Sequence, residues 1–205
     1  MKRLATLSAL AFALSLGTGS PTVGAATLRW SFQGPLTSLD PYSLNETPTI
    51  SALGNVYEGL VRRRPNLEME SALAERWETL DPKHWRFHLR KNVKFQNGEP
   101  FTADDVLFSA ERVRAKGSDF ITRIPADAKF EKEDDYTVDV LLTMPNPTLL
   151  NEWSTWFIMS KSWAEKNNAV SPVSASDKNP NYAAYHANGT GHPRPLPKRT
   201  VCRNW

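Results

Sequence analysis

Cysteine is almost missing from this sequence: of 205 residues, only Cys202 is a cysteine. A disulfide within the chain is therefore excluded, and packing must hold the fold. The sequence also lacks a GxSxG motif, a glycine-rich phosphate loop and a CxxC pair, which mark hydrolases, nucleotide-binding proteins and redox proteins. Its four histidines lack metal-ligand spacing. The sequence thus indicates no enzyme, no cofactor and no metal site.

Apolar runs long enough to cross a bilayer are also lacking, because a spanning helix needs about 20 apolar residues. The longest apolar stretch, from Leu4 to Leu16, follows Lys2 and Arg3 and is followed by small residues up to Ala25. A short apolar core behind a basic start is typical of a secretory signal peptide. Residues 1–25 are therefore predicted to direct export and to be removed.

Acidic residues are missing from two segments, 1–25 and 192–205, which carry six of the chain's 25 basic residues. All 22 acids therefore lie in residues 26–191, where the remaining 19 basic residues leave a net charge of −3, against +3 for the whole chain. The net charge of this middle part therefore gives no support for a nucleic-acid partner, since binding to phosphates needs a basic folded surface. The length of this middle part is sufficient for one hydrophobic core.

Alternation of apolar and polar residues predicts several strands. Residues 85–89 place tryptophan, phenylalanine and leucine in turn with arginine and histidine, the pattern of a strand with one buried face. The same pattern predicts a first strand over 27–32 and a β-hairpin over 128–142. The three acids from Glu133 to Asp135 fall inside this hairpin. We expect an exposed turn there and not a calcium loop, because no glycine accompanies the acids.

A helix is predicted from Thr47 to about Val61, because Thr47 can cap a helix that has Pro48 at its first position. The arginines at 62–64 are then expected at its solvated end, where cations favour the carbonyl terminus. An anion-binding patch is the alternative for these arginines. Shorter helices are predicted over residues 71–77, 148–156 and 162–167, with Trp153, Trp156 and Trp163 as packing residues.

A second capped helix is predicted after the turn at Asn97-Gly98. Thr102 supplies the capping hydroxyl, and apolar residues follow at helical spacing until Gly117. Asp104 and Asp105 fall in the first turn, where carboxylates favour the positive end of the helix dipole. Because neighbouring residues on a helix point about 100° apart, these two acids are not an acid–base pair for one substrate.

Three blocks of the sequence occur in the order and spacing of a known family: NVYEGL at 55–60, ALAERWE at 72–78 and FHLRKNVKFQNGEPFTADDV at 87–106. With these blocks, the chain from Thr27 to Gly191 resembles the family 5 solute-binding proteins of ABC importers, the group of dipeptide and oligopeptide receptors. Members of that family are longer, so the resemblance covers their N-terminal portion only.

The resemblance implies an α/β or α+β lobe with a mixed sheet. The lobe is part of a periplasmic-binding-protein type II-like fold, with an inserted αβ subdomain at about 50–170. It also implies a periplasmic, monomeric receptor that binds a small solute, in the first place a peptide, and delivers it to an ABC permease without catalysis, cofactor or nucleic acid. Such receptors close two lobes over the ligand. A secreted hydrolase and a stand-alone secreted binding or scaffold module remain the alternatives.

Ligand contacts are implied after the turn at residues 39–41, which in the family leads from the first strand towards the ligand cleft. Tyr42, Asn45, Glu46 and Thr47 are therefore the candidate ligand-binding residues. Packing within the loop is the alternative for each, and helix capping is the alternative for Thr47. The charged groups that anchor peptide termini in the family lie outside the portion that this chain resembles.

Residues 192–205 depart from the family, in which the NGTG block at 188–191 is followed by Pro-Phe and a strand. The segment contains three prolines within five residues and four cations without an acid, a composition that predicts a non-homologous, disordered extension. A polyproline ligand or an anion-binding arm is the alternative. Our hypothesis for the change is a shifted reading frame or a truncated gene, and the chain is then expected to be impaired as a receptor.

Overall fold

The computed structural model describes residues 36–191. The signal peptide expected at 1–25, the strand expected at 27–32 and the extension at 192–205 lie outside the described residues. In chain order the elements are α1 (Thr47–Leu53), β1 (Val61–Arg63), β2 (Met69–Ser71), β3 (Ala74–Asp81), β4 (His84–Leu89), α2 (Ala103–Arg114), β5 (Lys129–Asp134), β6 (Thr137–Leu141), α3 (Leu149–Trp153), α4 (Lys161–Lys166) and the short 3-10 helix η1 (Tyr182–Ala184).

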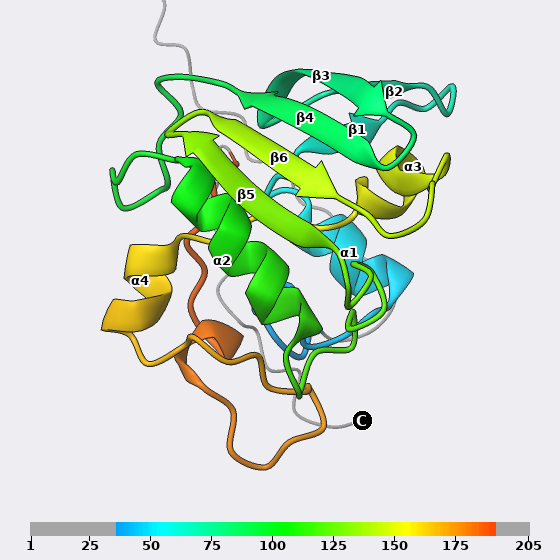
Figure 1. The fold of residues 1–205 in the computed structure, drawn as a ribbon. Helices are drawn as coiled ribbons and strands as arrows, with labels where there is room; N and C mark the ends of the chain where they lie inside the picture. The colour runs from blue at the N-terminus through cyan, green and yellow to red at the C-terminus, as the bar shows by residue number, and fades with distance from the viewer. Residues whose placement is uncertain (1–35, 192–205) are drawn as a thin grey trace, which may run out of the picture. The chain divides into compact units, whose positions relative to one another are not determined.

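Four strands form the main sheet in the order β3-β4-β6-β5, and β1 and β2 form a separate two-stranded sheet. All of these strand pairs are antiparallel. Figure 1 shows α2 lying across the main sheet beside β5. The strand predicted at 85–89 is confirmed as β4, and the hairpin predicted at 128–142 is confirmed as β5 and β6. Helices packed on strands in one core also confirm the predicted α and β fold class.

Helix α2 begins with the predicted cap. The Asp105 carboxylate accepts a 2.9 Å hydrogen bond from the backbone nitrogen of Thr102, and the two residues form a capping box. The helix ends at Arg114, before Gly117. Gly117 has φ +99°, and a Cβ on it would lie 2.5 Å from the Pro172 carbonyl oxygen. The buried residues of α2 and of the sheet include Val106, Ala110, Val113, Phe87, Val138 and Val140.

The helix predicted from Thr47 to Val61 is too long. Helix α1 ends at Leu53, and Val61 already begins strand β1. The Asn55 side-chain amide donates to the Ser51 carbonyl oxygen at 3.0 Å, so it satisfies a carbonyl at the helix end. Residues 61–63 pair with 69–71. The arginines therefore lie on and beside a strand, and their predicted place at a helix end is wrong.

The helix predicted at 71–77 is also wrong, because this segment enters strand β3. Trp77 pairs with Phe87 and Ala74 pairs with Leu89 of β4. Alanine, leucine and glutamate favour a helix, but helix propensity is a weak preference that tertiary pairing overrides. Strand β4 has one buried face, and β3 pairs along one of its edges.

Two tryptophans fill the space beside the sheet. Trp153, at the end of α3, and Trp156 are both fully buried, with ring centroids 5.1 Å apart. The Trp153 ring also lies 5.8 Å from Phe87 and 5.6 Å from Phe130, the spacing of favourable aromatic pairs. The predicted packing roles of these two tryptophans are confirmed. Trp163, on α4, is half-buried.

Candidate functional site

The segment predicted to contact ligand begins inside the molecule. Tyr42 is 1% exposed, and its hydroxyl donates a 2.5 Å hydrogen bond to the Phe157 carbonyl oxygen. Burial raises the pKa of Tyr42 well above its usual range, so the hydroxyl stays neutral. Direct contact with a ligand does not fit this burial, and we assign Tyr42 to the core.

The next three candidates, Asn45, Glu46 and Thr47, are exposed. Glu46 is the N-cap residue of α1 and makes no side-chain capping bond, while Thr47 is the first helical residue. Thr47 was predicted to be the N-cap residue, but the N-cap lies one position earlier, at Glu46. These three side chains have no hydrogen-bond partner among residues 36–191, so their amide, carboxylate and hydroxyl groups face solvent. We call them the 45–47 edge.

An open hollow of about 810 Å³ adjoins the C-terminal end of α1. The Glu58 carboxylate lines it and accepts a 3.0 Å hydrogen bond from the Thr190 hydroxyl. Arg62 and Arg63 line it too: Arg62 pairs with Glu70, and the Arg63 guanidinium donates to the Asn151 carbonyl oxygen at 3.4 Å. We call this cavity the Glu58 hollow. Its lining also includes Ile50, Gly54, Tyr57, Ser154 and Phe157.

The Glu58 hollow carries groups of both charges. Arg62 and Arg63 line it together with Glu58. Glu70, the partner of Arg62, is not one of the lining residues, and hydrogen bonds from Arg64 and then from Arg62 hold its pKa below the usual value. Glu58 supplies an acceptor and the arginines supply donors. Such a lining can bind a polar or zwitterionic solute through hydrogen bonds and ion pairs.

The NGTG block forms one wall of the hollow by lying directly on the backbone after α1. The Gly191 amide donates a 2.9 Å hydrogen bond to the Val56 carbonyl oxygen. A Cβ on Gly189 would lie 2.0 Å from that same oxygen, and a Cβ on Gly191 would lie 2.7 Å from it. Only residues without a side chain allow this approach, so the two glycines of the block are required by packing.

Sequence reasoning did not predict the Glu58 hollow. The one available signal was Glu58 itself, an acid inside the otherwise mostly apolar NVYEGL block.

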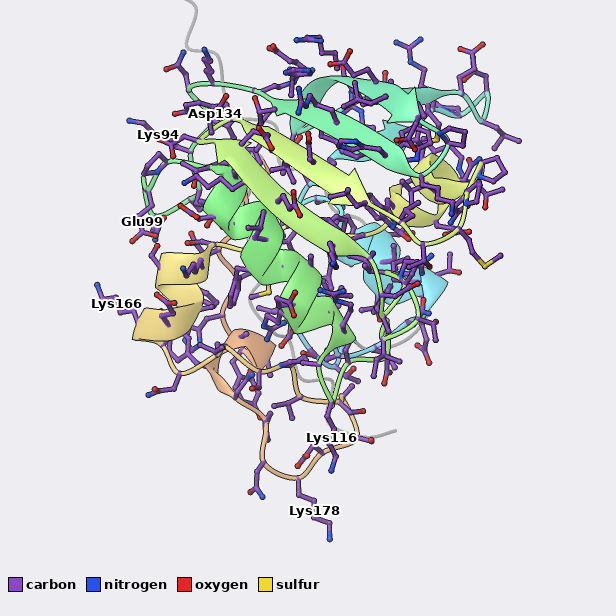
Figure 2. All side chains as sticks on the ribbon, viewed as in Figure 1. Lys94, Glu99, Lys116, Asp134, Lys166 and Lys178 are labelled. Carbon is purple, nitrogen blue, oxygen red and sulfur yellow. The ribbon has the colours of Figure 1, made fainter. Side chains whose placement is uncertain are left out.

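A second cavity, of about 180 Å³, lies between Ser38 and the loop that carries Asp177 and Lys178. In Figure 2, Lys178 projects from the end of the molecule that also carries Lys116.

The histidines of the sheet are paired with carboxylates. The Nε2 atom of His84 lies 2.9 Å from Asp139, and that of His88 lies 2.9 Å from Glu78. Among the described residues, no group of three histidine, cysteine or acidic side chains is arranged to hold a metal ion. Within the same residues, no helix is both long and apolar enough to cross a membrane.

The described residues thus combine an α and β core with a polar, open hollow. The model of the bacterial extracellular solute-binding proteins, family 5 Middle, matches residues 68–192. The match covers more than half of the chain. This chain therefore belongs to the family 5 bacterial extracellular solute-binding proteins, as its sequence blocks predicted.

Two relatives illustrate the similarity in sequence. The chain is 32% identical over 130 residues to the periplasmic oligopeptide-binding protein OppA of Haemophilus influenzae, a match that covers 54% of this chain and 24% of OppA. It is 29% identical over 152 residues to the HTH-type transcriptional regulator SgrR of Escherichia coli, which covers 72% of this chain and 26% of SgrR.

Two solved structures show the same fold. The binding protein AgaA of A. tumefaciens R10, in complex with agropinic acid, is 27% identical with a TM-score of 0.63, and the match covers 75% of this chain and 30% of AgaA. The Helicobacter pylori protein DppA, in complex with the peptide STSA, is 28% identical with a TM-score of 0.59, covering 75% of this chain and 33% of DppA. This chain thus spans from 24% to 33% of the length of these four relatives.

Proposed function

We propose that this chain supplies one wall of an extracytoplasmic solute-binding protein that delivers peptides to an ABC permease. The observation that carries the proposal is the family match over residues 68–192. The similarity to OppA and to the STSA complex of DppA favours a peptide. The similarity to the agropinic acid complex of AgaA makes an opine the competing ligand.

The 45–47 edge is the proposed ligand contact. A peptide presents the same backbone N–H and C=O groups whatever its sequence, together with an ammonium and a carboxylate group. The Asn45 amide and the Thr47 hydroxyl can exchange hydrogen bonds with such a backbone, and the Glu46 carboxylate can attract an ammonium group. All three are exposed and free of partners among the described residues. Tyr42 supports this edge from within the core.

We further propose that the chain alone is an impaired receptor. The matched parts of OppA and DppA are 24% and 33% of those proteins. A clamp binds tightly when two walls remove the ligand from water, and hydrogen bonds on one open wall compete with solvent. We also propose that the protein is a monomer and that it has no nucleic-acid partner. The signal peptide at 1–25 would direct it to the periplasm.

Isothermal titration tests the proposal, with the tetrapeptide STSA and a dipeptide mixture as probes. The nucleotide sequence beyond codon 205 first shows whether further receptor sequence, a permease gene and an ATPase gene follow. If receptor sequence continues there, we call the protein that includes it the longer receptor. We expect micromolar or tighter binding by the longer receptor and much weaker binding by this chain. Micromolar binding by this chain alone contradicts its impairment. A longer receptor that binds opines and not peptides contradicts the peptide assignment and leaves the family assignment intact.

A matched pair of variants tests the 45–47 edge in the longer receptor. Glu46→Gln should weaken peptide binding by about tenfold, because it removes one charge-assisted contact. Glu133→Gln, at another exposed glutamate, on β5, should leave binding unchanged. Equal affinities for the two variants would show that Glu46 does not contact the peptide.

A further inference from the structure

A buried ion pair holds the turn that precedes the 45–47 edge. Asp40 is 1% exposed and Arg112, on α2, is 2% exposed. Two parallel hydrogen bonds join them, from Nη1 to Oδ1 at 2.8 Å and from Nη2 to Oδ2 at 2.5 Å. Burial is the largest single influence and lowers the pKa of Arg112, but the hydrogen bonds to Asp40 and the attraction of its charge together raise that pKa above its usual value. Arg112 therefore keeps its charge inside the core.

The same arginine ties together two segments far apart in the sequence. Its Nε atom donates a 3.0 Å hydrogen bond to the Ala169 carbonyl oxygen, and its guanidinium lies 5.2 Å from the centre of the Tyr42 ring. Its Nη2 atom, which already donates to Asp40, also donates to the Ser171 carbonyl oxygen at 3.4 Å. Arg112 thus connects the turn at 40–43 to the loop that follows α4.

The backbone of the turn is held from three further sides. The Asp40 carboxylate accepts a 3.0 Å hydrogen bond from the Tyr42 nitrogen. The Tyr42 carbonyl oxygen accepts from Asp119, and the Ser43 carbonyl oxygen accepts from Ala175, both at 2.9 Å. Exposure begins only at residue 45. The turn is therefore the fixed base from which the 45–47 edge projects.

A buried ion pair is weak evidence for stability, because removing two charges from water offsets most of their attraction. Apolar residues of similar size in place of such a pair often give an equally stable fold. The planar fork of an arginine does something that apolar residues cannot, because it fixes the orientation of its carboxylate. The geometry at Arg112 accordingly points to a role in conformation more than in overall stability.

We propose that Arg112 is a positioning residue, which sets the conformation of the turn at 40–43 and through it the orientation of the 45–47 edge towards a ligand. The part that concerns the ligand rests on the proposed function, whereas the part that concerns the turn does not. Arg112 does not contact the ligand itself, because it is buried.

Amide hydrogen exchange and NMR order parameters of the full chain test the positioning role. Arg112→Lys keeps the charge and removes the fork. We expect at least about tenfold faster exchange at the Ser43, Asp119 and Ala175 amides, together with lower order parameters at residues 45–47. The amides of the β5–β6 hairpin should exchange as in the parent chain.

Arg86→Lys is the matched control, since Arg86 makes the corresponding two-pronged contact with Asp139 on the sheet. It should leave the turn and the 45–47 edge unchanged. Unchanged exchange at the turn in Arg112→Lys overturns the proposal. So does a uniform rise that includes the hairpin, because that result indicates general destabilisation.

A double replacement keeps the test decisive if Arg112→Lys does not fold. Asp40→Leu with Arg112→Met removes both charges and keeps the site packed. We expect a folded chain with an intact hairpin and a mobile 45–47 edge; a folded chain with an ordered edge overturns the positioning role. Titration with the peptide STSA separates the two proposals. A mobile edge together with unchanged peptide affinity in the longer receptor contradicts the ligand contact and leaves the role of Arg112 in the turn standing.

Discussion

Replacing Trp153 by alanine should remove a large part of the stability of this chain. Trp153 is fully buried against Phe87, Phe130 and Trp156, at ring distances of 5.8, 5.6 and 5.1 Å. Truncation of a buried aromatic residue to alanine costs about 3–5 kcal/mol, because burial is lost and a cavity remains. Each lost aromatic pair contributes about 0.5–1.5 kcal/mol beyond burial, so the upper half of that range is expected here.

Urea unfolding followed by circular dichroism measures this loss. With a slope of about 2 kcal/mol/M for a domain of this size, a loss of about 4 kcal/mol lowers the midpoint by about 2 M. Trp163→Ala, at a half-buried tryptophan, should lower it by less than half as much. Trp153→Phe should be mild, since it keeps a stacked ring and removes an indole N–H that has no partner among the described residues. A fall of under about 0.5 M for Trp153→Ala would refute the role of this cluster in the core.

Three further perturbations test particular contacts. Gly189→Ala should cost about 1–3 kcal/mol, because its Cβ would meet the Val56 carbonyl oxygen; an unchanged melting temperature contradicts this close approach. Thr102→Ala should cost about 1 kcal/mol through the lost cap of α2, measured by urea unfolding, and no loss contradicts the cap. Hydrogen bonds from Arg86 lower the pKa of Asp139, so this pair stabilises the fold above the ordinary aspartate pKa of about 3.9, and the contribution is lost as pH falls through the lower folded-state pKa. Asp139→Asn should therefore flatten the fall in stability below about pH 4, and identical acid unfolding curves for parent and variant would rule out this linkage.

Local chemistry made several elements predictable. The alternation at 85–89 predicted β4 because a strand exposes successive side chains on opposite faces. The Thr102 hydroxyl predicted the start of α2 because a cap acts within one turn. The structure adds the Asp105 carboxylate as its partner in a capping box. The hairpin at 128–142 needed only two alternating runs and a short polar turn between them. In each case the deciding contacts lie within a few residues in the sequence.

Other elements depended on partners that the sequence does not place. Residues 71–77 were predicted as a helix, and from Ala74 they form strand β3 because β4 offers an edge for pairing. Residues 61–63 likewise become β1 through pairing with 69–71. Hydrogen bonds to another segment outweigh the small intrinsic preferences of single residues, and these bonds exist only after the chain has folded.

The candidate site divides in the same way. The family blocks in the sequence identified the class of protein and directed attention to residues 42–47. Only the tertiary structure showed Tyr42 to be buried, and only it brought Glu58 and Thr190 within 3.0 Å across 132 positions of sequence. Composition and periodicity determine which side chains avoid water. A binding surface instead forms where segments distant in the sequence come together, and only the packing of the whole chain determines which segments those are.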